Sequence, residues 1–229
     1  MARLYNPLKI EIKVLFFLLG RRAEASSTSE SPILEEYRPR SYKKKNVHFQ
    51  ATCRDFSKLY DDLSSCDVFI KCEDKTFKAH KVVLQARSTV FAAMFKSDMM
   101  ESKTGVVNIK EMKTSVFKLF LKYLYSASLP KVSISNAKEL YKAADQYDVE
   151  ELKLACSQFL IRNVSRQNAC DMLVLADLHS DKELREKAIN YIIQQKIPEH
   201  GKKWPEFCQI HCTLANEVLN LYIKTHCSK

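Results

Sequence analysis

The spacing of apolar residues between positions 56 and 109 predicts a short helix, a small sheet and a longer helix. Apolar side chains recur at the i, i+3, i+4 and i+7 positions of an amphipathic helix at Phe56, Leu59, Tyr60 and Leu63. Two apolar runs, 67–72 and 76–79, flank the polar turn 73–75 and predict a pair of strands. Further apolar patterns predict one helix over residues 80–95 and a third strand over residues 106–109.

Only helical patterns follow the third strand. They are centred on residues 116–124, 140–147, 152–160, 172–176, 184–192 and 214–222, with a break near Gly201 and Pro205. A few strands followed by many helices predict the α+β class, with an all-α extension after it.

The N-terminal segment has a different pattern. Residues 8–14 alternate between apolar and charged side chains and predict a strand that ends before Gly20. A signal peptide is the alternative, because Arg3 precedes the apolar run and Ala23-Glu24-Ala25 resembles a cleavage site with small residues at its two ends. Against it, the uninterrupted apolar run is shorter than the ~7–15 residues of such a core, and Arg21 and Arg22 follow it. A membrane span would need about 20 apolar residues, so we expect no membrane partner.

Residues 21–53 are predicted to be a disordered linker. They are rich in serine, proline and like charges, and such a segment buries too little apolar surface to offset its ordering entropy. The lysine run 43–45 within it is either part of a solvated linker or a nuclear import signal.

Glycine content and charge limit the classes of function. Only three of the 229 residues are glycine, which leaves no glycine-rich loop for a phosphate or a dinucleotide. The net charge is +10, but residues 1–50 hold ten basic and five acidic residues against 27 and 22 in the rest. Half of the excess therefore lies in the first 50 residues, which favours a basic tail over a face for specific nucleic-acid binding.

The cysteine and histidine residues do not predict a catalytic or metal centre. The chain has eight cysteines, and several lie on apolar helix faces, which favours free thiols in a reducing compartment. Cys208, His211 and Cys212 have the side chains of zinc ligands but not the spacing of a common zinc site. His80 begins an apolar helix without a nucleophile motif nearby, so we expect a structural histidine. We therefore expect a non-enzymatic protein without cofactor or metal.

Three segments resemble a known family. Residues 67–70, 77–84 and 86–95 resemble a BTB/POZ domain, and residues 175–180 (Leu-Ala-Asp-Leu-His-Ser) resemble the speckle-type POZ protein family. The resemblance covers roughly residues 54–195. It implies a BTB/POZ fold, a helical cluster capped by a short sheet, over residues 54–162, and a BACK-type helical region over residues 163–229. Members of that family also carry a MATH domain, and residues 1–20 resemble a remnant of its terminal strand.

The resemblance also implies a function. Such proteins are dimeric adaptors of cullin-3 ubiquitin ligases, which regulate ubiquitin-dependent degradation of other proteins. Their cullin-contact motif, a hydrophobic residue two positions before Glu, matches Met99-Met100-Glu101, and Phe95 and Tyr125 complete the implied contact set. The implied dimer interface consists of Phe56, Leu59, Tyr60, Leu63, Asp67 and Lys81.

Two functional classes remain open at this point. The first is a homodimeric cullin-3 adaptor, nuclear or cytoplasmic, that also forms mixed dimers with relatives that contain a MATH domain. The second is a self-associating scaffold or transcription-related BTB protein that does not bind a cullin. The motif at Met99 to Glu101 distinguishes them, because only the first class uses it.

Overall fold

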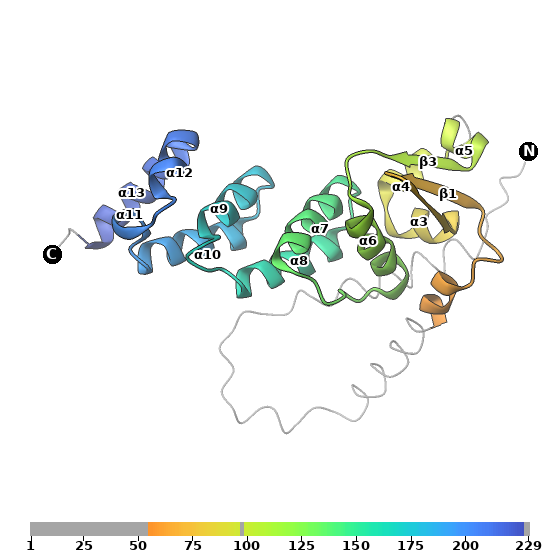
Figure 1. The fold of residues 1–229 in the computed structure, drawn as a ribbon, viewed down its shortest axis with the longest axis horizontal. Coiled ribbons are helices and arrows are strands. Elements are labelled where there is room, and N and C mark those ends of the chain that lie inside the picture. The colour runs from red at the N-terminus through yellow and green to blue at the C-terminus, as the bar shows by residue number, and fades with distance from the viewer. Residues whose placement is uncertain (1–54, 97–98, 227–229) are drawn as a thin grey trace, which may run out of the picture. The chain divides into compact units, whose positions relative to one another are not determined.

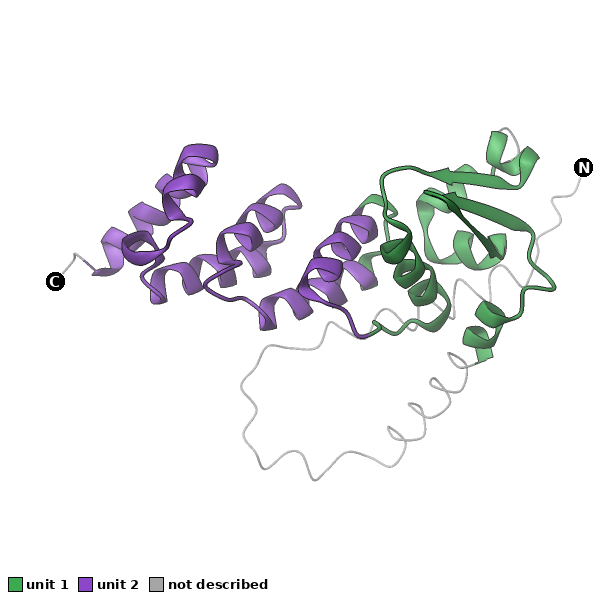
Figure 2. Cartoon of the chain, in the orientation of Figure 1, with its two compact units in different colours: residues 1–130, 146–151 green, residues 131–145, 152–229 purple. Residues whose placement is uncertain are grey.

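The computed structural model describes residues 55–96 and 99–226 (Figure 1). The strand predicted at residues 8–14 and the linker predicted at residues 21–53 lie outside this part. The chain divides into two compact units, residues 1–130 with 146–151 and residues 131–145 with 152–229 (Figure 2). We call them unit 1 and unit 2 and describe each by itself.

Unit 1 contains a three-stranded sheet and several short helices. Its described elements are a helix at residues 55–61, β1 (Val68–Cys72), β2 (Lys75–Ala79), α3 (Lys81–Arg87), α4 (Thr89–Met94), α5 (Met100–Thr104), β3 (Val106–Ile109) and α6 (Thr114–Ser126). The strand order is β2-β1-β3. β1 pairs antiparallel with β2, with Val68 opposite Ala79, and parallel with β3, with Phe69 opposite Val106. The three strands predicted within residues 67–109 are therefore correct.

The helix predicted over residues 80–95 is two helices. Ser88 has extended backbone angles, φ −142° and ψ 125°, and separates α3 from α4. Its hydroxyl accepts the N–H of Phe91 at 3.2 Å, which caps α4, and donates to the carbonyl oxygen of Tyr147 at 2.6 Å. Both bonds satisfy polar groups that a buried break in a helix would otherwise leave unpaired.

Packed aromatic rings form part of the core of unit 1. The ring centroid of Tyr147 lies 5.0 Å from that of Phe91 and 5.3 Å from that of Phe120. Phe117 and Phe120 of α6 are fully buried. Burial raises the pKa of the Tyr147 phenol to about 12. Tyr147 thus links α4 to α6.

Unit 2 consists of helices. They are α7 (Ile134–Gln146, whose last residue is assigned to unit 1), α8 (Glu150–Arg162, of which residues 150–151 are in unit 1), α9 (Ala169–Leu178), α10 (Lys182–Gln194), α11 (Ile197–His200), α12 (Trp204–Ile210) and α13 (Cys212–His226). The predicted all-α region is correct. Gly201 lies between α11 and α12, as the predicted break requires, but Pro205 lies in the first turn of α12, where a proline lacks no hydrogen bond of the helix.

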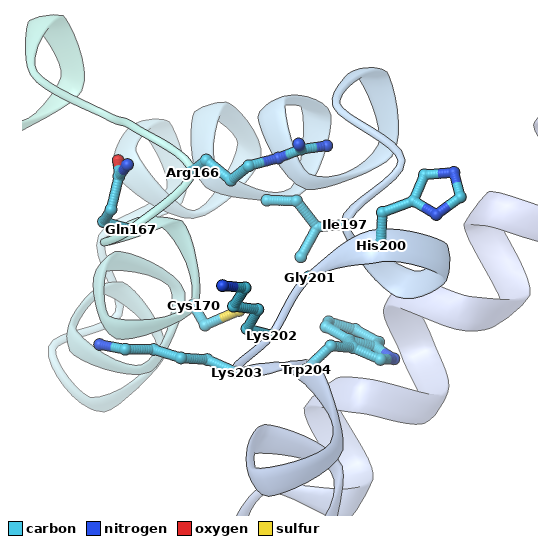
Figure 3. Close-up of a pocket in the computed structure, with 9 residues that line it drawn as sticks. All are labelled: Arg166, Gln167, Cys170, Ile197, His200, Gly201, Lys202, Lys203 and Trp204. Atoms are coloured by element: carbon cyan, nitrogen blue, oxygen red, sulfur yellow. The ribbon is translucent and has the colours of Figure 1, made fainter.

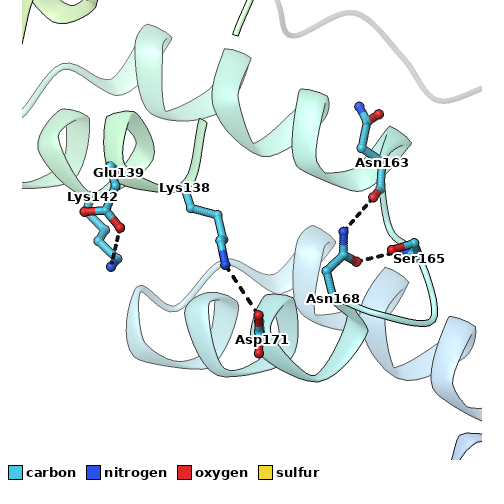
Figure 4. A network of polar contacts seen from close by, with 7 residues as sticks. All are labelled: Lys138, Glu139, Lys142, Asn163, Ser165, Asn168 and Asp171. Carbon is cyan, nitrogen blue, oxygen red and sulfur yellow. Dashed lines mark hydrogen bonds and ion pairs between the residues drawn. The ribbon is translucent and has the colours of Figure 1, made fainter. Parts of the chain in front are cut away.

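Polar contacts join the helices of unit 2. Asp181 caps α10 by accepting the N–H of Leu184 at 3.0 Å, and it also accepts the hydroxyls of Ser157 at 2.7 Å and Tyr141 at 3.1 Å. Asn168 closes the loop between α8 and α9: it accepts the N–H of Ser165 at 2.7 Å and donates to the carbonyl oxygen of Asn163 at 3.0 Å (Figure 4). Both local contacts, at Asn168, and contacts between distant residues, at Asp181, thus fix the helix ends.

Two general properties of the described residues bear on function. None of the helices within residues 55–96 and 99–226 is long and apolar enough to cross a membrane. The six cysteines in these ranges are free thiols.

Candidate functional site

The segment that contains Met99, Met100 and Glu101 is partly helical. No apolar pattern predicts a helix between Phe95 and the strand at Val106, but residues 100–104 form α5, with Met99 as its N-cap residue. The carbonyl oxygen of Met99 accepts the N–H of Ser102 at 3.1 Å. Gly105 ends the helix at φ 66°, a left-handed conformation that glycine adopts without steric cost. The helix therefore holds the three side chains of the motif on one ordered turn.

The motif presents apolar surface beside a carboxylate. Met99 is 47% exposed and Met100 is 68% exposed, which is unusual for large apolar side chains next to each other. Glu101 is half-buried in the first turn of α5. Methionine is flexible and polarisable, so it adapts to an irregular partner pocket, and a neighbouring carboxylate gives direction to such a contact.

Phe95 and Lys81 lie next to this segment and are joined to it through Lys81. Phe95 is only 7% exposed and stacks on Phe91, with ring centroids 6.1 Å apart. The Lys81 ammonium lies 5.7 Å from the Phe95 ring centroid and donates to the carbonyl oxygen of Ser102 at 3.5 Å. Lys81 thus connects α3 to α5.

Tyr125 lies beneath the surface rather than on it. Its side chain is 2% exposed, and its hydroxyl accepts the backbone N–H of His80 at 2.9 Å and lies 2.9 Å from Nδ1 of the same residue. Burial raises the pKa of the Tyr125 phenol to about 12. Nε2 of His80 lies 2.9 Å from Oγ of Ser65, so both ring nitrogens have partners, as expected for a structural histidine. In this conformation Tyr125 offers almost no area to a partner, and its contact with a cullin stays a prediction.

The residues predicted for the dimer interface are partly exposed. Phe56, Leu59 and Tyr60 are half-buried on the helix at residues 55–61. Leu63 lies past the end of that helix and is 49% exposed, so the predicted four-residue stripe continues beyond the helix. The ring of Tyr60 meets that of Tyr125 edge-on at 5.6 Å. Part of this stripe therefore packs on its own unit, and part remains available.

Asp67 contacts the backbone of Lys81 and not its ammonium group. The Asp67 carboxylate accepts the backbone N–H of Lys81 at 2.7 Å, at the start of α3. The Lys81 ammonium instead points to Ser102 and Phe95, as described above. The carboxylate therefore acts as a helix cap within the unit.

Two exposed apolar residues of unit 1 were missed in the sequence. Phe69 is 42% exposed and Val82 is 44% exposed. The signal for Phe69 was its position between Val68 and Ile70, which are fully buried, because strand residues alternate between faces. Val82 gave no such signal, because it stands next to the apolar residue Val83 in α3 and the sequence does not show which of the two faces the core.

The described residues contain no group of three or more His, Cys, Asp or Glu side chains arranged to hold a metal ion. Cys208 lies in α12 and is half-buried, and Cys212 begins α13 and is exposed. The expectation of a protein without metal and without cofactor stays a prediction.

Comparison with known proteins agrees with the geometry. Residues 56–164 match the family model of the BTB/POZ domain. The curated protein maternal effect lethal 26 of Caenorhabditis elegans is 33% identical over 173 residues, which cover 75% of this chain and 44% of that protein. The chain thus spans less than half the length of this relative. The match to the family model begins in the helix at residues 55–61 and continues through α8.

Proposed function

The chain carries a BTB/POZ domain over residues 56–164, and from this premise we propose that it is a non-catalytic adaptor that binds cullin-3 and itself. In this role it would bring other proteins to a cullin-3 ubiquitin ligase and so regulate their degradation. Either the nucleus or the cytoplasm is a suitable site for this activity.

The exposed surface at Met99, Met100 and Glu101 carries the proposal. The resemblance to the speckle-type POZ family implies a cullin contact at these residues, and the exposure of both methionines supports it. The helical turn of α5 fixes the carboxylate of Glu101 relative to them. A preformed contact loses less side-chain and backbone entropy on binding than a mobile loop does.

Self-association is the second part of the proposal. The half-exposed residues of the helix at 55–61, together with Leu63 and Phe69, supply apolar area that a second copy would cover. A two-fold dimer uses the same patch on both copies, so a patch of this kind also accepts a relative with a similar BTB/POZ domain. Mixed dimers with relatives that contain a MATH domain would change how many partners one assembly binds.

Binding to the N-terminal region of cullin-3 tests the adaptor role. Isothermal titration with the full chain is compared with the variant Met99→Glu with Glu101→Lys, which reverses the chemistry of the motif. We expect micromolar or tighter binding by the wild type and a loss of about 100-fold in the variant, since a buried apolar anchor and a charge are both changed. Leu178→Glu with Glu186→Lys makes the equivalent changes at exposed positions of unit 2 and should bind as the wild type does.

The possible results separate the two functional classes. A wild-type chain that does not bind cullin-3 contradicts the adaptor role and leaves the self-associating scaffold. Equal binding by the motif variant keeps the adaptor role but moves its contact elsewhere. Light scattering of the same samples tests self-association, and a monomer at high concentration contradicts the proposed dimer.

A further inference from the structure

Unit 2 contains a cavity of about 410 Å³ (Figure 3). It lies between the loop that enters α9, the short helix α11 and the start of α12. Its volume falls within the range of about 300–1,000 Å³ that is typical of ligand sites. The lining residues are Arg166, Gln167, Cys170, Ile197, His200, Gly201, Lys202, Lys203 and Trp204.

The floor of this cavity is apolar. Trp204 is 6% exposed and Ile197 is 2% exposed, and the Trp204 ring lies against Phe207 with centroids 5.2 Å apart. Cys170 is half-buried, and burial raises the pKa of its thiol to about 11, so the sulfur stays protonated and uncharged at neutral pH. These side chains form a surface that favours an apolar group over water.

A close backbone approach shapes one wall. Gly201 donates its N–H to the carbonyl oxygen of Ile197 at 2.7 Å. A Cβ atom at this position would lie 2.6 Å from Cγ2 of Ile197 and 2.7 Å from its carbonyl oxygen, which is too close for any side chain. Glycine therefore allows the chain to turn directly from α11 into the lysine pair at 202–203 and Trp204.

The rim of the cavity is basic. Arg166, Lys202 and Lys203 are exposed, and within the described ranges none of them has an acidic partner at ion-pair distance. The Arg166 guanidinium donates to the carbonyl oxygen of Gln195, which positions it without neutralising it. Figure 3 shows Arg166 on one side of the opening and the segment from Lys202 to Trp204 on the other.

Two acidic residues near the cavity have bonded partners, and Glu206, in the first turn of α12, is exposed and does not line the cavity. Glu199 accepts the hydroxyl of Tyr222 and lies 3.4 Å from Nε2 of His200. Asp171 pairs with Lys138 at 3.4 Å (Figure 4). The permanent positive charge of the lining therefore belongs to Arg166, Lys202 and Lys203.

We infer that this cavity binds a short acidic peptide segment of a partner protein, with one apolar side chain on Trp204 and Ile197 and carboxylates on Arg166, Lys202 and Lys203. Charge complementarity selects the carboxylates, and the guanidinium offers them paired N–H donors. The apolar floor distinguishes this ligand from a bare phosphate or a nucleic-acid backbone, which would leave the floor uncovered. An apolar centre inside a charged rim is the usual composition of a specific peptide contact.

This inference does not depend on cullin binding. Its residues lie in unit 2, whereas the motif at Met99 lies in unit 1. If the chain binds both cullin-3 and the peptide, the cavity is the site that holds the protein which the adaptor brings to the ligase. Peptide binding and cullin binding are measured in separate experiments. A failure of peptide binding therefore leaves the result for cullin binding unchanged, and the reverse also holds.

Trp204 gives a direct measurement, because it is the only tryptophan of the chain. The full chain is titrated with the capped peptide Ac-Glu-Glu-Leu-Leu-Glu-Glu-NH₂, which lacks aromatic residues, and tryptophan fluorescence is recorded. We expect a saturable change that weakens about tenfold when the salt concentration rises from 0.05 to 0.5 M, since screening acts on the rim contacts. The same peptide with Gln in place of every Glu, and the peptide with Ser in place of both Leu, should each bind at least tenfold more weakly.

Charge reversal at the rim tests the site itself. Lys202→Glu with Lys203→Glu should weaken the peptide at least tenfold. Lys182→Glu with Lys187→Glu makes the same charge change at exposed positions of α10 outside the cavity and should leave binding unchanged. Circular dichroism checks that both variants fold, and the peptide series gives an answer on the wild type alone.

Several results would overturn the inference. One is the absence of a saturable signal with the acidic peptide up to millimolar concentration, and another is equal binding of the glutamine peptide. Titrations with inorganic phosphate, an RNA oligonucleotide and vesicles of phosphatidylserine complete the set. If one of these gives the saturable, rim-dependent signal and the peptide does not, the cavity serves that ligand instead.

Discussion

The surface at Met99 in unit 1 and the cavity beside Trp204 in unit 2 have opposite chemistry. The first is formed by exposed methionines and a carboxylate on a short helix, and the second by a buried apolar floor with three cations around it. A partner that fits one therefore lacks the groups that the other needs. One chain with two such surfaces is suited to connecting two different proteins.

The two surfaces also differ in what supports them. In unit 1, Phe95 stacks on Phe91, which packs on Tyr147, so α5 stands next to an aromatic core. In unit 2, fully buried aliphatic side chains such as Leu173 and Ile192 form the core, and hydrogen bonds and ion pairs of Asp181 and Asp145 also join the helices. Substitutions in each unit test these two kinds of support.

Truncation in the aromatic core should have the largest effect on stability. Phe120 is fully buried, so Phe120→Ala should lower the free energy of unfolding by about 3–5 kcal/mol through lost burial and a cavity. Urea unfolding followed by circular dichroism measures it. Leu178→Ala, at a residue that is 73% exposed, is the control and should change stability by less than about 0.5 kcal/mol. Similar effects of the two variants would contradict the role of the aromatic core.

Removing one buried hydroxyl in unit 1 should have an intermediate effect. Tyr125→Phe keeps the ring but deprives the buried backbone N–H of His80 of its acceptor, which should cost about 1–3 kcal/mol. Tyr60→Phe, at a half-buried residue with no such bond among the described contacts, is the matched control. Unfolding curves of both variants that coincide with the wild type would show that the His80 bond is dispensable.

In unit 2, the corresponding test is Asp181→Ala. The change removes the cap of α10 and an acceptor of two hydroxyls, and we expect a loss of about 1–2 kcal/mol. Trp204 fluorescence during urea unfolding reports this loss in the unit concerned. Asp181→Asn keeps a capping oxygen and should recover part of the stability. If the alanine variant unfolds as the wild type does, polar contacts are not what organises these helices.

The smallest effect concerns the pH dependence of unit 2. Burial alone would raise the pKa of Asp145, but hydrogen bonds from Lys153 and His179 outweigh it and the pKa lies below its usual value. A carboxyl whose pKa is lower in the folded state stabilises the fold above its unfolded pKa, about 3.9, and this contribution is lost as the pH falls through the folded pKa. Asp145→Asn should cost on the order of 1 kcal/mol or less at pH 7 and flatten the acid limb of the stability curve. An unchanged acid limb would contradict this assignment.

Local sequence patterns predicted most elements but not how distant segments meet. The three strands of unit 1 and the helices α6 to α10 and α13 followed from apolar spacing, because each spacing is local. The helices α11 and α12 did not, since the pattern there predicts a break. The break at Ser88 did not, because it depends on the carbonyl oxygen of Tyr147, 59 residues away. Similarly, the pattern predicts no helix at α5, since five residues are too few to show a helical period.

The two functional surfaces also differ in how far the sequence predicts them. The motif at Met99 is contiguous, so a resemblance of a few residues was enough to select it. The cavity joins Arg166 and Cys170 to residues 197–204 through the packing of α9, α11 and α12. No spacing within either segment indicates that they meet.

Cullin-3 binding, measured side by side on three proteins, tests the account most directly. Isothermal titration with the cullin-3 N-terminal region compares the wild-type chain, Met99→Glu with Glu101→Lys, and Lys202→Glu with Lys203→Glu. We predict binding by the wild type and the lysine variant with equal affinity, and a loss of about 100-fold in the motif variant alone. A wild-type chain that fails to bind, or a motif variant that binds as tightly as the wild type, would contradict the assignment of this surface.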